Sequence, residues 1–224
     1  MLGSGWTDES LLGKIRRMLA LRFESVSSPI VTPEVFDAIA RLIVRLEPMG
    51  LLPKLRKPVE VDIDLLRALA RKLSDHGIAR AALAQVFASP PDPARLRRAL
   101  EAVLRDLEQT PIPETEWSAL VEILDADLLG ALVGVSASSV RRYATGERKT
   151  PDDAAERLHF VALVVGELAG AYNDVGIRRW FGRPRTALGG KTPRSMMHRN
   201  WTPDGPGPKR VRELAASLSG SPAT

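Results

Sequence analysis

The chain has 224 residues, a formal net charge of +5 and no cysteine, which excludes disulfide bonds, thiolate metal sites and cysteine nucleophiles. Its length is enough for one large domain or two small ones with a hydrophobic core. Leu, Ala, Arg and Glu are abundant, whereas Thr, Ile and Tyr are scarce, a composition that favours helices over sheet. We therefore expect an all-α protein.

Charge is unevenly distributed along the chain. Residues 178–224 contain ten Lys or Arg residues against Asp204 and Glu213, whereas residues 1–177 have a slight acidic excess. This asymmetry indicates an anionic partner for the C-terminal part, although a solvated basic helix face would give the same pattern. The N-terminus lacks the features of a secretory signal, and the longest apolar stretch, residues 160–172, is too short to cross a bilayer. We expect a cytoplasmic protein with no membrane partner.

Residues 1–112 are predicted to form a helical module for docking or oligomerisation, of otherwise unknown role. One helix has a clear start, because Thr32 is a good N-cap and Pro33 suits the first helical position. Apolar residues then recur at helical spacing up to Leu46. Gly77 and the turn-like SPPDP separate further helices. The expected helices cover residues 10–22, 32–47, 63–74, 77–88 and 92–109.

The segment QTPIPE, residues 109–114, is the best candidate for a domain boundary, because its two prolines disfavour a continuous helix. A short amphipathic helix, WSALVEIL, follows it. The predicted domains are residues 1–112, 113–172 and 173–218, with residues 219–224 as a tail.

The segment that follows is typical of a helix–turn–helix. Asp125 is a good N-cap for a helix over residues 126–133, and Gly130 provides the small residue needed where this helix approaches the next. Gly134 stands where the turn requires positive φ, and Ser136 can cap the second helix. The small core of the motif is expected to contain Leu129, Val133, Val135, Val140 and Tyr143.

The second helix of this motif has a polar and basic outer side. A recognition helix presents such side chains to base edges in the major groove, and cations in the following loop contact phosphates. A structural helical hairpin reused for protein contacts would have a similar pattern. The expected DNA-binding residues are Ser136, Ser138, Ser139, Arg141, Arg142, Thr145, Arg148 and Lys149.

The C-terminal part combines one long helix with short ones. Thr150 and Pro151 are expected to start a helix that ends near Tyr172. RPRTALGG cannot form regular helix, since it contains a proline and two consecutive glycines. Thr192 and Pro193 then start another short helix by the same cap-then-proline pattern, and PKRVRELAASL forms the last one.

The letters GGKT look like the tail of a phosphate-binding loop. The full pattern, GxxxxGK[ST], requires a glycine five residues before Gly190, where Arg185 stands, and a buried strand leading into the loop. RRWFGRPRT is basic and interrupted by proline, which is unsuited to a strand. We therefore reject a nucleotide site here and expect Gly189 and Gly190 to form a tight turn.

The stretch RRWFGRPRTALGGKTPRSMM resembles the C-terminal toxin-binding domain of the Xre/MbcA/ParS-like antitoxins. LDADLLGALVGVSASSVRRYATGERKTPDDAAERL also looks like the Xre-type DNA-binding domain that these antitoxins carry. Together the two resemblances cover about residues 115–218. The residues at the family spacing, which form its scaffold, are Trp180, Pro184, Leu188, Gly189, Gly190, Thr192 and Pro193.

The resemblance implies an antitoxin that neutralises a RES-domain toxin, which consumes NAD, and represses its own operon. Operator DNA and the toxin would then be its partners, with the protein a homo-oligomer that is nucleoid-associated when bound to DNA. Residues 1–112 exceed what the short antitoxins have, so an added role is expected.

Apolar and basic residues near the C-terminus have a composition suited to an interface. The basic ones could contact an acidic or nucleotide-binding cleft, such as that of the toxin which the resemblance implies, or the DNA backbone. Core filling is the alternative for the apolar ones, and for Trp180 we favour the core. The expected toxin-binding residues are Arg194, Met197, Arg199, Trp201, Lys209 and Arg210.

No catalytic constellation is visible in the sequence. His76, His159 and His198 are far apart, so we expect no metal site and treat each as an ordinary surface or semi-buried residue. No GxSxG elbow occurs, and we expect neither enzyme activity nor a cofactor. Two other functions remain open: a stand-alone helix–turn–helix regulator whose N-terminal helices bind another protein, and a scaffold whose basic C-terminal part binds nucleic acid.

Overall fold

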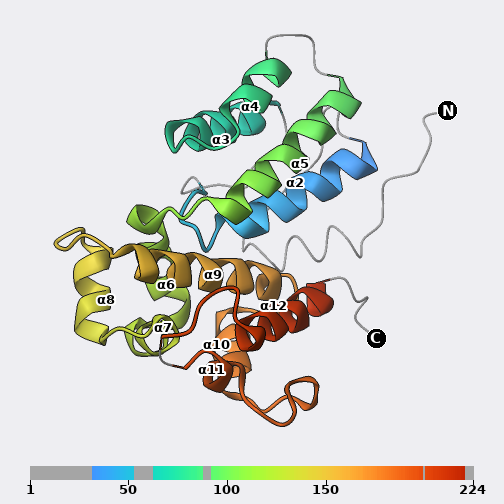
Figure 1. Ribbon diagram of the computed structural model, residues 1–224. Helices are drawn as coiled ribbons and strands as arrows, with labels where there is room; N and C mark the ends of the chain where they lie inside the picture. The colour runs from blue at the N-terminus through green and yellow to red at the C-terminus, as the bar shows by residue number, and fades with distance from the viewer. Residues whose placement is uncertain (1–31, 53–62, 88–91, 199, 220–224) are drawn as a thin grey trace.

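The computed structural model describes residues 32–52, 63–87, 92–198 and 200–219 of the chain (Figure 1). These residues form helices and connecting loops without a strand, so the expected all-α fold is confirmed for the part described. The N-terminal helices are α2 (Pro33–Leu46), α3 (Ile63–Asp75), α4 (Arg80–Phe87) and α5 (Pro93–Gln109). The second half contains α6 (Pro113–Leu124), α7 (Ala126–Val133), α8 (Ala137–Ala144), α9 (Asp152–Ala169), α10 (Asp174–Gly182), the 3-10 turn η1 (Thr186–Leu188), α11 (Pro193–Met196) and α12 (Pro206–Ser219).

Local signals place most helix starts where the sequence predicts them. Thr32 caps α2 by accepting a hydrogen bond from the Val35 amide at 3.4 Å, and Pro33 occupies the first helical position. Asp92 caps α5 through the amides of Ala94 and Arg95. The helix expected at residues 10–22 lies outside the described residues.

Helix α9 lies at the centre of the fold. It contacts α2, α6, α7, α10 and α12 (Figure 1). Twelve of its residues are buried, on all sides of the helix, which is the pattern of a helix enclosed by others. The helix–turn–helix segment and the C-terminal helices are therefore built on the same support.

The start of α9 differs from the expected one. Thr150 does not cap the helix; Pro151 occupies the N-cap position without a side-chain hydrogen bond, and Asp152 is the first helical residue. The helix also ends at Ala169, three residues before Tyr172. The Thr150 hydroxyl instead accepts a hydrogen bond from the indole of Trp117, described below.

The N-terminal layer, α2 to α5, is packed directly onto the second half. The loop after α2 approaches α6 so closely that a Cβ at Gly50 would lie 2.6 Å from the Thr115 carbonyl oxygen. The Thr115 hydroxyl donates to the Met49 carbonyl at 2.6 Å. One continuous core runs through all three predicted domains, whose boundaries stay a prediction.

Among the described residues, α9 and α10 satisfy the length and apolarity of a membrane span only as a pair bent by 117°, and no single helix does so.

Candidate nucleic-acid interface and C-terminal partner segment

Helices α7 and α8 are joined by a tight turn whose geometry follows from three residues. Asp125 caps α7, because its Oδ1 accepts from the amides of Asp127 and Leu128 at 3.1 and 2.9 Å. Gly134 adopts φ +85°, a left-handed conformation that glycine reaches without strain. Ser136 caps α8 by accepting from the Ser139 amide at 3.1 Å. These predicted local features of the motif are confirmed.

Gly130 is required by the close approach of the two helices. A Cβ at this position would lie 2.7 Å from the Val135 carbonyl oxygen and 3.4 Å from the Ala137 amide nitrogen. Real Cβ contacts do not reach the first distance, so the backbone of the turn would have to move. The expected role of Gly130 as a packing residue is therefore confirmed.

The inner side of α8 is fixed by an aromatic contact from α6. Val140 and Tyr143 are buried, as predicted, together with Leu129 and Val133 of α7. The Tyr143 ring stacks on Trp117 with centroids 5.1 Å apart. Trp117 Nε1 donates to the Thr150 hydroxyl at 2.9 Å, which ties the loop after α8 to α6.

The outer side of α8 faces solvent. Ser136, Ser138, Arg141, Arg142 and Thr145 are exposed, whereas Ser139 is half-buried. The serine hydroxyls are engaged with one another, since Ser136 Oγ lies 2.9 Å from Ser138 Oγ and 3.0 Å from Ser139 Oγ. The Thr145 hydroxyl donates to the Arg142 carbonyl at 3.2 Å. Within the described part of the chain, the exposed guanidiniums of Arg141 and Arg142 make no hydrogen bond or ion pair, so their donors are available.

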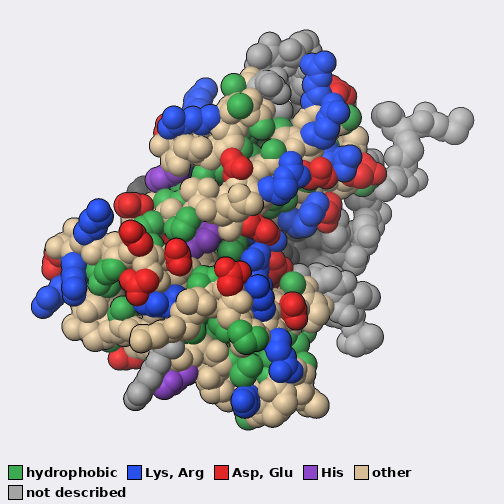
Figure 2. Space-filling view, in the orientation of Figure 1, with side chains coloured by type: hydrophobic (Ala, Val, Ile, Leu, Met, Phe, Trp, Pro, Cys, Tyr) green, Lys and Arg blue, Asp and Glu red, His purple; other side chains and the backbone are tan. Residues whose placement is uncertain are grey.

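Four cations form the exposed basic edge of this motif: Arg141, Arg142, Arg148 and Lys149. Figure 2 shows Lys and Arg side chains on the side of the molecule that carries α8. The Arg148 guanidinium lies over the Tyr143 ring, 5.5 Å from its centroid. Within the described part of the chain none of the four makes an ion pair, so their charge is available to an external anion.

The predicted scaffold residues of the C-terminal segment hold a compact loop between α10 and α11. Trp180, Leu188 and Pro193 are buried, and Gly189 and Gly190 have φ +65° and +77°. Thr192 caps α11 by accepting from the Ser195 amide at 3.1 Å, as predicted, while Pro184 is exposed. The Arg185 guanidinium lies over the Trp180 ring at 5.4 Å.

The glycine loop does not present its amides to solvent as a phosphate-binding loop would. The Leu188 and Gly190 amides both donate to the Arg185 carbonyl, at 2.9 and 3.0 Å. The Gly189 amide donates to the Thr186 carbonyl, and the Arg185 amide donates to the Lys191 carbonyl, which brings the two ends of the loop together. Since the amides are used inside the loop, its geometry agrees with the sequence argument against a nucleotide site.

The expected toxin-binding residues fall into two groups. Arg194, Lys209 and Arg210 are exposed. Lys209 makes an ion pair with Asp204 at 3.3 Å, and Arg210 Nη2 donates to the Ala187 carbonyl at 3.0 Å, which joins α12 to the glycine loop. Arg199 lies outside the described residues.

Met197 and Trp201 correct the sequence-based prediction, because neither is available at the surface. The exposed fraction is 0% for Met197 and 7% for Trp201. Trp201 packs edge-on against Phe160 of α9, with ring centroids 5.1 Å apart. The alternative of core filling therefore holds for both residues.

A buried pair of titratable residues was missed by the sequence argument. His159 Nδ1 lies 2.6 Å from Glu116 Oε1, and the exposed fractions of the two residues are 5% and 0%. Burial raises the pKa of Glu116, and the hydrogen bond with His159 opposes that shift. Glu116 Oε2 and His159 Nε2 have no partner within the described residues. No signal joins these positions in sequence, because 43 residues separate them.

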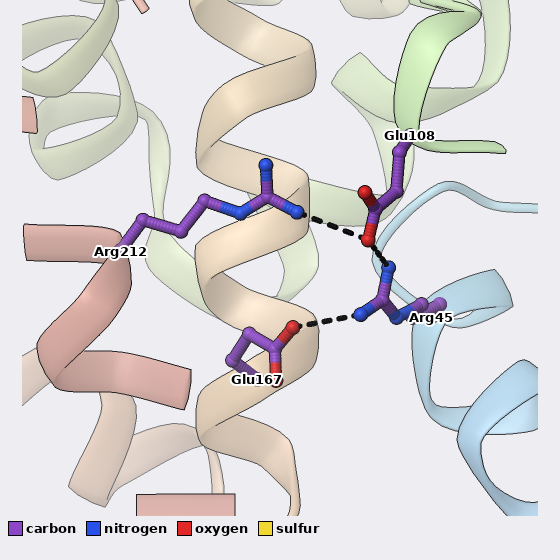
Figure 3. A network of polar contacts seen from close by, with 4 residues as sticks. All are labelled: Arg45, Glu108, Glu167 and Arg212. Atoms are coloured by element: carbon purple, nitrogen blue, oxygen red, sulfur yellow. Dashed lines mark hydrogen bonds and ion pairs between the residues drawn. The ribbon is translucent and has the colours of Figure 1, made fainter. Parts of the chain in front are cut away.

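A charge network joins one residue from each of four helices, α2, α5, α9 and α12 (Figure 3). Arg45 of α2 pairs with Glu108 of α5 and with Glu167 of α9, the latter at 2.9 Å, and Arg212 of α12 reaches Glu108 at 3.2 Å. Burial acts to raise the pKa of Glu108, but the two guanidiniums outweigh it and leave that pKa below its usual value. The network therefore links the N-terminal layer to α9 and α12.

No protein-family model matches this chain, and comparison with curated proteins and with solved structures finds no significant relative. Among the described residues there is no group of three or more acidic or histidine side chains arranged to hold a metal ion.

Proposed function

We propose that this protein is a cytoplasmic antitoxin that binds operator DNA through α7 and α8 and neutralises a RES-domain toxin through its C-terminal segment. It acts as a homo-oligomer and represses its own operon. The observation that carries the DNA-binding half is the exposed basic edge: Arg141 and Arg142 on α8, which Trp117 supports from inside, and Arg148 and Lys149 in the loop after it.

The geometry of α8 suits a major groove. The groove is about 12 Å wide and admits one α-helix. Trp117 and Gly130 fix the inner side of the motif, so the outer side can enter the groove without rearrangement. Arg141 and Arg142 are the candidates for base edges, and Arg148 and Lys149 in the following loop are suited to phosphates.

The toxin-binding half rests on the resemblance of residues 178–197 to the antitoxin family. Arg194, Lys209 and Arg210 support it, since exposed cations on neighbouring elements suit an acidic or nucleotide-binding cleft. We retain these three as contact residues and treat Met197 and Trp201 as core.

The DNA-binding half is tested by selecting duplexes from a random 30-base-pair library with the full-length protein. We expect a defined sequence to be enriched, and its binding to weaken steeply with added salt. Failure to enrich any sequence, or salt-insensitive binding, would reject the groove assignment.

The toxin half is tested by expressing the protein encoded by the adjacent reading frame, alone and with this chain, while cellular NAD is measured. We expect growth arrest and NAD loss that this chain prevents. If that partner is harmless and does not bind the chain, the antitoxin function is wrong.

A stand-alone regulator whose N-terminal helices bind another protein is the second candidate. It is favoured by the N-terminal layer, which is packed onto α9 and contains α2 to α5 in addition to the motif. Purification from native cells distinguishes the two: recovery of a protein that requires α2–α5, with no RES-domain partner, supports the regulator.

A further inference from the structure

The C-terminal end of α7, directly before the turn, is completed by side chains from other elements. The last carbonyls of a helix have no partner inside the helix. The Leu132 carbonyl accepts a hydrogen bond from Trp201 Nε1 at 2.7 Å, and the Val133 carbonyl accepts one from Arg157 Nε at 2.7 Å. The end of α7 is thus held by the C-terminal segment and by α9.

Trp201 is well fixed in this position. It lies between α11 and α12, its exposed fraction is 7%, and its ring meets Phe160 edge-on. The bond to Leu132 spans 69 residues of sequence and is itself buried. A buried hydrogen bond with fixed partners on both sides restrains direction as well as distance.

The end of α7 cannot shift without moving the start of α8. The Gly134 and Val135 amides both donate to the Gly130 carbonyl, at 2.8 and 2.9 Å. Gly130 is also in close backbone contact with Val135 and Ala137, as described above. A displacement at Leu132 is therefore passed to the cap and first turn of α8.

We propose that Trp201 is a positioning residue for α8: its indole N–H holds the end of α7 and thereby sets the orientation of the helix that reads DNA. Trp201 contacts no DNA in this arrangement. The inference rests on the proposed DNA binding of α8, but the restraint on the turn is a property of the protein alone.

The test compares two buried tryptophans in the full-length protein. Trp201→Phe removes the N–H donor and part of the ring. Trp180→Phe is the matched control, because Trp180 is also buried in the C-terminal segment but its Nε1 has no partner within the described residues. A third variant carries 3-benzothienylalanine at position 201, which replaces the N–H by sulfur and keeps the ring shape.

Circular dichroism first establishes that each variant is folded. Two quantities are then measured: the affinity for the duplex selected by the wild type, and the rate of hydrogen exchange of the Gly134 and Val135 amides. We expect both changes at position 201 to weaken binding about fivefold, the size of one lost hydrogen bond, and to speed exchange in the turn. Trp180→Phe should change the affinity by less than about twofold, since it leaves that bond intact.

Equal effects at positions 180 and 201 would overturn the inference, because general loss of stability would then explain both. An unchanged affinity and exchange rate in the benzothienyl variant would overturn it as well. If the wild type selects no duplex, the proposed DNA binding fails. The exchange rates then decide alone whether Trp201 restrains the turn.

Discussion

Arg45 and Glu167 form a partly buried ion pair, with Nη2 and Oε1 2.9 Å apart, that fastens the N-terminal layer to the central helix. The two residues are 122 positions apart in sequence. Arg45 also pairs with Glu108, which Arg212 contacts from α12 (Figure 3). One guanidinium thus lies at the junction of the N-terminal layer with the rest of the molecule.

Removing that guanidinium should loosen the junction. We expect Arg45→Met to lower the free energy of unfolding by about 1–3 kcal/mol, because Glu167 and Glu108 lose a half-buried counter-charge. Arg41→Met is the control on the same helix: its pair with Asp37 is more than half exposed and should cost less than about 0.5 kcal/mol. Urea denaturation followed by circular dichroism measures both. Equal losses would show that the network contributes no more than a surface pair.

Glu47 should make stability depend on pH near neutrality. Burial, with a smaller contribution from Asp174, raises its pKa from 4.5 to about 7. A carboxyl whose folded pKa is raised contributes stability that is complete below pH 4.5 and is lost as the pH rises through about 7.

Glu47→Gln removes this dependence because the amide stays neutral. Above pH 8 we expect the free energy of unfolding of the variant to exceed that of the wild type by about 1–2 kcal/mol. A fully buried group would contribute ~1.4 kcal/mol for each unit of its pKa shift, but solvent screens this partly buried site and reduces the effect. The difference should vanish below about pH 4.5, the unfolded pKa of glutamate. Denaturation curves from pH 4 to 9 measure it, and a constant difference would contradict the assignment.

The buried Glu116 and His159 should behave as one unit. His159→Leu leaves a buried carboxylate without its partner, so we expect a loss of about 3 kcal/mol. Glu116→Leu alone should also destabilise the protein. The double replacement should cost less than the sum of the single ones, because no unpaired polar group remains. A double-mutant cycle measures the coupling, and strict additivity would mean that the two groups do not depend on each other.

Replacing Gly130 within α7 and Gly134 in the turn after it should lower the free energy of unfolding by different amounts. Gly134→Ala meets no neighbouring atom within 4 Å, so it carries only the strain of a left-handed residue, about 1 kcal/mol. Gly130→Ala places a Cβ against the Val135 carbonyl and should cost about 2–3 kcal/mol. Thermal unfolding ranks the two variants. The reverse order would mean that α7 and α8 move apart to accommodate the Gly130→Ala methyl group without loss of stability.

The paired replacement Arg141→Ala/Arg142→Ala should weaken DNA binding and leave stability unchanged, because both side chains are exposed. We expect a loss of about 1–3 kcal/mol for each base contact removed, and a shallower salt dependence where a phosphate contact is lost. Arg98→Ala, on the exposed face of α5, is the control and should have no effect. Titrations of the selected duplex at several salt concentrations measure both. A double variant that binds like the wild type would remove α8 from the interface.

Local chemistry explains why much of the fold can be predicted from the chain alone. Thr32, Asp125, Ser136 and Thr192 cap helices as expected, because an N-cap acts on amides two or three residues away. Gly134 likewise follows from the positive φ of its own backbone. The all-α class and the tight turn between α7 and α8 depend on such short-range terms.

The features that the sequence did not predict depend on contacts between segments that are distant along the chain. Thr150 is of a residue type that often caps helices, but its hydroxyl accepts a hydrogen bond from the Trp117 indole. Trp201 is of a type common at interfaces, but it lies in the core. The Glu116–His159 pair and the Arg45 network likewise have no local signature. Whether an apolar or charged side chain is buried depends on what α9 brings beside it, and that packing arises only when the whole chain is folded.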